Sequence, residues 1–484
     1  MQLTRWLSMI FALGGVALAA TTSSSDGRAA GLPAAFSQRL MAAMAGVDKA
    51  ELYKSPDSGN LAWGESYVLD AYYWMYEGTG DTAWLDRIVR HADVILGNLS
   101  PGDELFPGWR TDRYSVALVD VRADPANPSK AHVKPDPARI FDIDTAHKVS
   151  GHDYELRVMA GGSLAITDTT TSQPVATVEL PADGHITAIP GVTLVVGGTL
   201  EPGDRFVVKT QAPAPLEYTV HDGMILAPIA RFCAAVARDA SLRERYGAAA
   251  QRYLKLMETQ LLPKWQPYWR ELPDGAGVYI FQDVPAQRFP GASQPHNQYL
   301  ALGRVYIAVY CATGDPRYRE RAEKMARFFK RNLRLVGGHY EWNYWDYAGP
   351  WDEQARAMAH TEDTSHGHID IAFAVDAYDA GIVFDREDMQ RFVRTITDAM
   401  WNGSDELPRV GGRVNSPEGP GIQALDWARL GRFSTKARQI MVRMIETSDN
   451  LNGSHSTAAA EVLAMARVDW NPRPNCALAA RPRQ

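Results

Sequence analysis

Two stretches of the chain repeat one pattern: residues 71–85 read AYYWMYEGTGDTAWL, and residues 305–319 read VYIAVYCATGDPRYR. Both carry tyrosines at matching positions, then Thr-Gly-Asp, then an aromatic residue three positions later. Glycine ends a helix in the left-handed conformation, and aspartate caps the helix that follows. Pro316 suits the first turn of that second helix. The repeat therefore predicts two copies of a helical hairpin.

Apolar residues at helical spacing predict further hairpins elsewhere in the chain. The hairpin of the first repeat spans about 61–77 and 82–98. The further hairpins span about 221–239 with 242–262, 366–380 with 386–401, and 421–430 with 434–448, and one more helix follows at 454–467. Long Trp- and Tyr-rich connections between hairpins are typical of loops that serve a site. We expect a mainly α fold, an (α/α)n toroid of about six to seven hairpins; an open solenoid is the alternative with the same periodicity.

Residues 110–215 interrupt the helical pattern with alternating strand-like runs between Gly, Pro and Asp turns. The interruption predicts a small β-rich module inserted into a toroid domain formed by residues 36–109 and 216–484. The module either binds or covers the glycan substrate, or it is an accessory domain that takes no part in catalysis. Arg110, at its entry, is a candidate to reach the substrate cleft.

Composition restricts the class of protein. The 484 residues are 45% hydrophobic with a formal net charge of −7, which does not fit a disordered chain or a nucleic-acid-binding surface. Trp (13) and Tyr (20) together outnumber Phe (14), as expected for a cleft that stacks rings on sugars and offers N–H and O–H groups. Three cysteines allow at most one disulfide, and Cys233 and Cys311 lie in apolar helical runs where packing is their expected role.

The N-terminus reads as an export signal. Arg5 precedes an apolar run that ends in Ala17-Leu18-Ala19, a small-x-small cleavage site, so residues 1–20 are interpreted as a signal peptide. Residues 21–35 are small and polar and are interpreted as a flexible linker. No later stretch approaches eighteen consecutive apolar residues, so we expect a periplasmic or secreted protein with no membrane partner.

Histidines concentrate in one part of the chain. Five of the twelve lie between positions 296 and 368, within or near the runs 339–351 and 360–370, which we interpret as active-site loops. β-Elimination from a uronic-acid polysaccharide uses such groups: donors neutralise the sugar carboxylate, one group takes the C5 proton, and another protonates the leaving oxygen. His296 and Asn297 fit the neutralising role. Tyr344 and His366 fit the acid and base roles.

These motifs carry a resemblance. Pro295-His296-Asn297, Tyr340 to Tyr344 and Glu362 to His366, together with the signal peptide and the hairpins, resemble the α/α-toroid polysaccharide lyases that cleave alginate or glucuronan. The resemblance covers about three quarters of the chain and excludes the β-rich segment. It implies an exported lyase acting on an anionic polysaccharide.

Further residues complete this hypothesis. Glu362 or His360 would orient His366. Trp63, Trp342 and Tyr347 would line the sugar subsites, and Glu65 would contact the substrate. Arg304 lies two helical turns after Asn297. It either helps to neutralise the substrate carboxylate or forms an ion pair within the protein.

Other functions remain open on the sequence. A glycoside hydrolase would use a carboxylate pair. The available carboxylates are Glu65, Glu341, Asp346, Glu362 and Asp363. A non-catalytic periplasmic glycan-binding protein would bind without turnover. No phosphate loop or dinucleotide fingerprint indicates an organic cofactor, and a divalent metal at His360, His366 and His368 is a lesser alternative.

Overall fold

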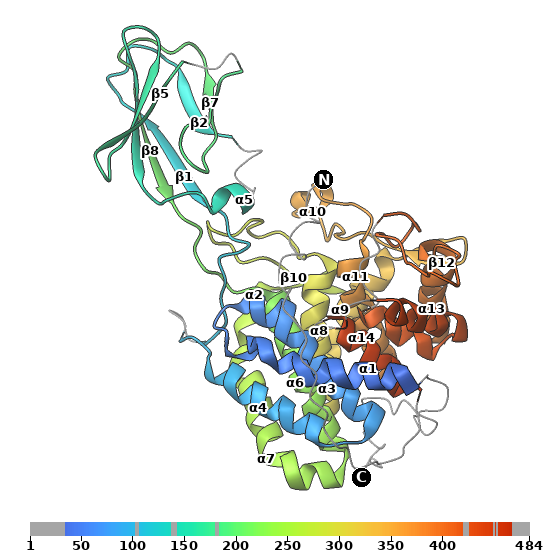
Figure 1. The fold of residues 1–484 in the computed structure, drawn as a ribbon. Coiled ribbons are helices and arrows are strands. Elements are labelled where there is room, and N and C mark those ends of the chain that lie inside the picture. Colours follow the sequence, from blue (N-terminus) through green and yellow to red (C-terminus); the bar gives the residue numbers. More distant parts are fainter. Residues whose placement is uncertain are drawn as a thin grey trace.

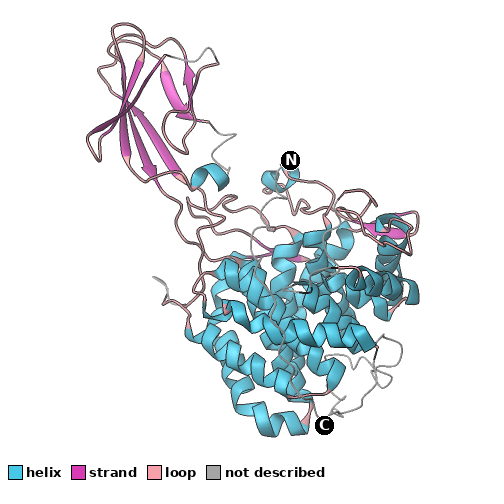
Figure 2. Cartoon of the chain, in the orientation of Figure 1, coloured by secondary structure: helices cyan, strands magenta, loops and turns pink. Residues whose placement is uncertain are grey.

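The computed structural model describes residues 34–101, 106–136, 143–179, 183–419, 425–448, 451 and 454–466. The chain is mainly helical with antiparallel sheets (Figure 2), as the sequence predicts. The predicted signal peptide lies outside the described residues, as does the predicted linker except for its last two residues, which begin α1 (Ala34–Gly46).

Most of the predicted hairpin segments form an inner helix followed by an outer helix that runs back beside it. The pairs are η3 (Leu61–Glu65) and α3 (Ser66–Thr79) with α4 (Ala83–Gly97), α6 (Thr219–Arg238) with α7 (Ala240–Leu256), α8 (His296–Thr313) with α9 (Pro316–Asn332), α11 (Thr364–Asp379) with α12 (Arg386–Arg394), and η7 (Leu425–Arg432) with α13 (Thr435–Glu446), followed by α14 (Ser454–Met465). Two details differ from the expectation: η7 is a 3-10 helix, and η3 is a π-helical turn.

The repeated Thr-Gly-Asp turn has the predicted conformation in both copies. Gly80 and Gly314 adopt φ of 74° and 76° and end α3 and α8 in the left-handed region. Asp81 and Asp315 then accept the backbone N–H of the residue two positions on, each at 2.9 Å. The same local chemistry therefore ends one helix and starts the next at two distant points of the chain.

The inner elements form a closed ring. In order around it, α3 contacts α6, then come α8, α11, η7 and α14, and α14 packs back on α3. An open solenoid lacks that last contact. Because each inner helix is followed by an outer one that returns, the inner helices run in one direction and their N-termini lie at one face of the ring. The partial positive charges of helix N-termini therefore gather at this face.

One inner helix is long and apolar enough to cross a membrane by length and composition. This helix, α6, is 94% buried over the window concerned, because it packs between α3 and α8. Among the described residues it is the single such helix, and its surroundings make it a core helix of the ring.

The strands between α4 and α6 form two antiparallel sheets that stand apart from the helices in Figure 1. One sheet has the order β1 (Leu118–Ala123), β8 (Arg205–Gln211), β3 (Asp153–Val158), β4 (Leu164–Asp168) and β5 (Gln173–Val178); the other has the order β2 (His132–Pro135), β7 (Leu194–Gly197) and β6 (His185–Ile186). Their buried side chains form a hydrophobic cluster separate from that of the helices.

Short elements connect the hairpins. They are η1 (Val47–Ala50), η2 (Leu52–Lys54), α2 (Ser58–Asn60), α5 (Ile143–Ala146), η4 (Met257–Leu261), η5 (Pro263–Tyr268), β9 (Trp269–Glu271), β10 (Gly277–Tyr279), β11 (Arg334–Val336), β12 (His339–Glu341), α10 (Glu353–Ala357) and η6 (Thr395–Met400). Cys233 on α6 is a free buried thiol, whereas Cys311 on α8 is disulfide-bonded, so packing is not the whole role of Cys311.

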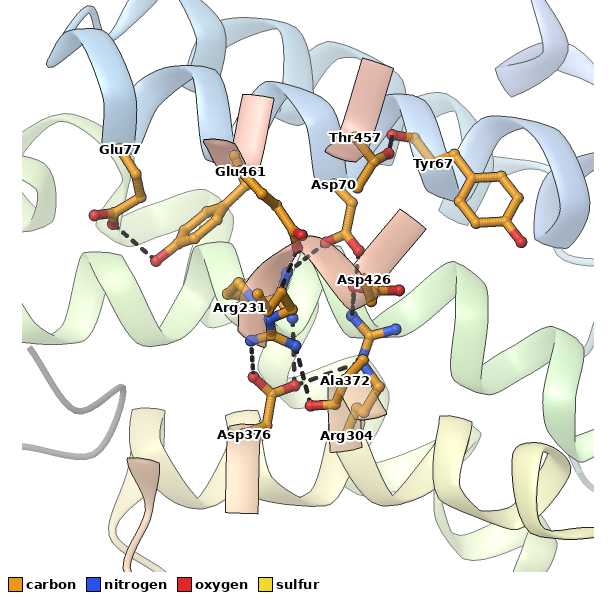
Figure 3. Close-up of polar contacts among 12 residues, drawn as sticks. Tyr67, Asp70, Glu77, Arg231, Arg304, Ala372, Asp376, Asp426, Thr457 and Glu461 are labelled. Atoms are coloured by element: carbon orange, nitrogen blue, oxygen red, sulfur yellow. Dashed lines mark hydrogen bonds and ion pairs between the residues drawn. The ribbon is translucent and has the colours of Figure 1, made fainter. Parts of the chain in front are cut away.

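The axis of the ring is filled by charged side chains (Figure 3), one or more from every inner element. Arg231 bonds Asp70 at 2.5 Å and Asp376 at 3.3 Å; Arg304 bonds the same two carboxylates at 3.2 and 3.4 Å. Arg429 bonds Asp376 as well. We call this group, together with Asp426 and Glu461, the axial network.

The charges of the axial network balance when one of its carboxyl groups holds a proton. It contains three guanidinium groups and four carboxyl groups, all of them buried. Burial, together with the charge of Asp426, raises the pKa of Glu461 well above its usual value, which favours the protonated, neutral form of Glu461. Three cations then face three anions, as buried charges require.

Close packing of α6 against α8 depends on a glycine. A Cβ at Gly223 would overlap the backbone of Ala301 and Leu302. We expect Gly223→Ala to lower the free energy of unfolding by about 1–3 kcal/mol, because the two helices would have to separate. The matched control is Gly247→Ala on the outer helix α7, where nothing lies within 4 Å; it should raise stability by about 0.5–1 kcal/mol. Chemical denaturation measures both, and equal effects of the two variants would contradict the expectation.

Candidate functional site

The first turn of α11 holds an aspartate and a histidine together. Asp363 is the N-cap of the helix, and its Oδ1 accepts the backbone N–H groups of Ser365 (2.8 Å) and His366 (3.0 Å). Its Oδ2 accepts from His366 Nδ1 at 2.7 Å. The His366 side chain is 32% exposed, and its Nε2 has no hydrogen-bond partner among the described residues. One ring nitrogen is therefore fixed while the other is available.

Asp363 stays ionised in this arrangement. Burial raises the pKa of Asp363, but the hydrogen bond and the charge of His366 outweigh burial and hold the pKa well below its usual range. The predicted orienting residues, Glu362 and His360, do not hold His366: Glu362 bonds elsewhere, and the exposed His360 contacts the Met358 carbonyl through Nδ1 at 2.8 Å. This expectation was wrong because the aspartate that caps the helix also reaches the imidazole.

Tyr344 packs against His366. Their ring centroids lie 5.1 Å apart, and His360 stacks on the same tyrosine at 5.2 Å. Burial raises the pKa of Tyr344 far above its usual value, against a smaller opposing effect of its hydrogen bond with Gln298. The structure thus brings the predicted Tyr344 and His366 together, as a neutral phenol beside an imidazole.

Glu362 and Asp370 form a buried pair of carboxyl groups that hydrogen-bond to each other. Burial, together with the charges of Asp370 and Asp363, raises the pKa of Glu362 well above normal. Burial also raises the pKa of Asp370 to about 6. Since two carboxylates cannot share such a site without a proton, Glu362 is protonated.

The raised pKa of Asp370 predicts a pH dependence of stability. The unfolded chain releases this proton near pH 4, whereas the native state holds it up to about pH 6. The contribution of the proton is therefore fully present below about pH 4, and as the pH rises to about 6 the free energy of unfolding should fall by about 3 kcal/mol. Asp370→Asn should remove this fall, measured by denaturation at several pH values, whereas Asp405→Asn, whose side chain is 82% exposed, should keep it. An unchanged pH profile in Asp370→Asn would contradict the expectation.

Trp342 does not line a sugar subsite. Its side chain is fully buried, packs on Phe329, Phe392 and Trp427, and donates Nε1–H to Asp370 Oδ2 at 2.9 Å. The prediction was wrong because this tryptophan turns into the helical core and supports the carboxyl pair from below.

His296 is also a core residue. Its side chain is fully buried against Phe328 and Phe329, and both ring nitrogens are used, by the Tyr299 hydroxyl at 2.6 Å and by Asp346 at 3.0 Å. It therefore cannot neutralise a substrate carboxylate as predicted. The neighbouring Asn297 is 2% exposed, and its Oδ1 has no hydrogen-bond partner among the described residues.

Aromatic side chains gather at the N-terminal ends of α3 and α6. Trp63 is half-buried and donates Nε1–H to His221 Nε2 at 3.1 Å, while Ser58 Oγ bonds His221 Nδ1 at 2.8 Å. Tyr114 and Tyr218 contact the same imidazole at 5.5 and 5.2 Å between centroids. Burial lowers the pKa of His221 to about 3, so the histidine is neutral. Trp63 is the predicted sugar-stacking residue that retains exposed ring surface beside this group.

Two other predicted substrate contacts are structural. Glu65 is buried and bonds His91 Nδ1 at 2.6 Å on α4, and Arg304 belongs to the axial network. Both lie on inner segments, but their side chains point into the core. For Arg304, the ion pair is thus the alternative that the structure selects.

The remaining predicted contacts are partly exposed. Arg110 faces Glu217 at 3.5 Å, and the ring of Tyr347 lies 4.6 Å beneath the guanidinium of Arg356. Nothing in these contacts assigns either residue to a substrate.

The predicted metal set is not assembled. His366 bonds Asp363, His368 bonds Asp426 and His360 bonds a carbonyl, so the three imidazoles have different partners. Among the described residues, the ligand atoms that lie within 4.8 Å of one another belong to Glu362, Asp363 and His366. Both oxygens of Asp363 already serve the cap and the imidazole, so this group fits a hydrogen-bonded arrangement better than a metal centre.

Sequence reasoning missed a second set of residues near the axis. Tyr67, His368 and Asp426 come from α3, α11 and η7 and form a chain of contacts described below. One sequence signal could have indicated them, because several inner helices carry a histidine in the first turn. These are His221, His366 and His368, with His296 and His455 at the start of two others.

No family model matches the chain, and no curated protein matches it in sequence. Several solved structures are similar to it at a distance. An inactive variant of an α-1,6-mannanase of Salegentibacter sp. HEL1_6, in complex with α-1,6-mannotetrose, is 10% identical, with 89% of this chain and 98% of that chain covered and a TM-score of 0.40. A family 76 glycoside hydrolase from a bovine Bacteroides thetaiotaomicron strain is 11% identical, with 74% and 76% covered and a TM-score of 0.29.

A third similar structure, FlgL of Xanthomonas campestris, is 13% identical, with 40% of this chain and 78% of that chain covered and a TM-score of 0.16. Two of the three similar proteins are thus carbohydrate-active enzymes. Because the three TM-scores lie below 0.5, the function has to be argued from the site itself.

Proposed function

We propose that this protein is a carbohydrate-active enzyme that cleaves a uronic-acid polysaccharide by β-elimination. The observation that carries the proposal is the pairing of a neutral Tyr344 with His366, whose Nδ1 is held by an ionised Asp363 and whose Nε2 is available. An oriented imidazole beside a neutral hydroxyl can move protons to and from a sugar.

β-Elimination needs exactly two proton transfers and no water. The C5–H electron pair forms the C4=C5 double bond, the C4–O pair leaves with the glycosidic oxygen, and that oxygen takes up a proton. Tyr344 and His366 exchange protons with the sugar in this scheme. Holding the uronate carboxylate needs N–H or O–H donors, and we assign this role to the side-chain amide N–H groups of Asn297.

An anionic substrate is compatible with the acidic chain. The formal net charge of −7 repels a polyanion as a whole. The N-termini of the inner helices, however, point to the face that carries Tyr344 and His366, and their partial positive charges favour an anion there. Trp63 offers a ring on which a sugar can stack.

A glycoside hydrolase is the second candidate. Adjacent carboxyl groups with opposite pKa shifts, as in Glu362 (raised) and Asp363 (lowered), are typical of an acid and base pair. The full burial of Glu362 and the use of Asp363 as a helix cap favour the lyase. A non-catalytic glycan-binding protein is the third candidate. We also propose that a signal peptide directs the export of this protein.

The test is incubation of the purified protein with alginate, glucuronan, pectate and hyaluronan, and with α-1,6-linked mannooligosaccharides. We expect absorbance of an unsaturated uronate product from one of the acidic polymers. New reducing ends without that absorbance would replace the lyase by the hydrolase. Binding without any product would replace both by a glycan-binding protein.

A further inference from the structure

A tyrosine, a histidine and an aspartate meet across the ring, just below the site. The Tyr67 hydroxyl lies 3.4 Å from His368 Nε2, and His368 Nδ1 lies 2.7 Å from Asp426 Oδ2. Tyr67 belongs to α3 and His368 to α11, which are opposite each other in the ring order. We call these three residues the cross-ring triad.

The axial network fixes the protonation of the cross-ring triad. Burial raises the pKa of Asp426, but the charge of Arg304, 3.8 Å away, and the hydrogen bond of His368 hold it well below its usual range. An ionised Asp426 can only accept, so His368 carries its proton on Nδ1. Its Nε2 faces the Tyr67 hydroxyl, the arrangement in which a third group holds the base that activates a hydroxyl.

Burial and the charge of Asp426 raise the pKa of Tyr67 well above its usual value, so its hydroxyl is neutral before the reaction. Tyr67 is half-buried, whereas His368 and Asp426 below it are buried, so the hydroxyl is the outermost member of the triad. The π-helical turn η3 ends two residues before it, and such turns often occur at functional sites. Thr457 of α14 donates to its backbone carbonyl at 2.7 Å and fixes the residue in place.

The triad also lies beside the pair described above. His366 and His368 are two residues apart on α11, so the same helix turn presents one imidazole to Tyr344 and the other to Tyr67. The two tyrosines therefore contact neighbouring residues of the first turns of one helix.

We propose that Tyr67 is the catalytic base that removes the C5 proton, with His368 and Asp426 as its positioning residues. This inference rests on the proposed function. The C5 proton passes to the Tyr67 oxygen as the Tyr67 proton passes to His368 Nε2. The C5–H electron pair forms the C4=C5 double bond, and the C4–O pair leaves with the glycosidic oxygen. That oxygen takes the hydroxyl proton of Tyr344, and exchange with water then restores the protonation states of Tyr344 and His368.

The test compares Tyr67→Phe with Tyr344→Phe on two substrates: the acidic polymer, and a uronoside with fluoride at C4. Fluoride departs with little need for a proton donor, whereas removal of the C5 proton is still required. We expect Tyr67→Phe to lose about 10²–10⁴-fold in kcat/KM on both substrates. Tyr344→Phe should lose activity on the polymer and recover most of it on the fluoride.

Each outcome decides between the proposals. Recovery of Tyr67→Phe on the fluoride, or full activity on the polymer, would overturn the assignment of Tyr67 while the lyase stands. A wild-type protein that forms no unsaturated product from any uronate would overturn the proposed function, and Tyr67 with it. Tyr318→Phe, on the outer helix α9 and bonded to Glu258, is the matched control and should keep wild-type activity. Thermal unfolding of Tyr67→Phe at the wild-type temperature establishes that the variant is folded.

Discussion

His366→Gln should reduce kcat/KM on the acidic polymer by about 10²–10⁴-fold. Glutamine keeps the size and polarity of the side chain but cannot exchange a proton near neutral pH. The Asp363 carboxylate would keep its cap bonds to the backbone, so the helix start should be preserved. The measurement is the initial rate of unsaturated product formation at several substrate concentrations, together with a thermal unfolding curve.

The control for this variant is His132→Gln. His132 is exposed on β2, in the β-rich segment, and its replacement should change neither the rate nor the unfolding temperature. A His366→Gln protein that turns over at the wild-type rate would remove the imidazole from the mechanism. A glutamine variant that is inactive but also unfolded would point to a structural role instead.

Arg304→Met should be the most destabilising single replacement in the ring. Methionine fills the space but leaves Asp70, Asp376 and Asp426 with one cation fewer in a buried position. Breaking a buried ion pair by removing one partner costs about 3–5 kcal/mol, because the remaining charge is uncompensated. Chemical denaturation, with the unfolding of the helical signal as readout, measures the loss.

Arg252→Met is the matched control for that replacement. Arg252 pairs with Asp93 at 3.0 Å, but both side chains are about half exposed, so water screens the pair. The expected loss is at most about 1 kcal/mol. Similar midpoints for the two variants would show that the axial network contributes no more than a surface pair.

The hairpins could be predicted because their signals are local. The Thr-Gly-Asp turns combine a glycine that adopts positive φ with an aspartate cap, and both act within a few residues. Apolar periodicity located the helices for the same reason. The 3-10 geometry of η7 and the π-helical turn η3 depend on packing in the ring, which no short window of sequence contains.

The site was predictable in part. Histidine density led to Tyr344 and His366, which the structure brings into contact. His296, Trp342 and Arg304 occur in the same motifs but turn into the core, and the direction of a side chain on a helix buried on all sides cannot be inferred from residue type. On such helices the apolar pattern covers the whole circumference, so it does not distinguish the face toward the axis from the others.

The cross-ring triad could not be predicted from the sequence, because it depends on the topology of the ring. Tyr67, His368 and Asp426 are separated by about 300 and 58 residues along the chain and meet only because the ring closes. Their partners were predictable as helices but not as neighbours across the axis.

The charge balance of the axial network restricts how this architecture can change its repeat number. In an open solenoid each repeat contacts only its neighbours, so repeats can be gained or lost one at a time. Here every inner element supplies a charged group to one shared set, and the set is neutral only when Glu461 holds a proton. Duplication or deletion of the hairpin that carries Asp70, Arg231, Arg304 or Asp376 would leave an uncompensated buried charge at the centre, so these hairpins cannot be gained or lost one at a time without a cost in stability.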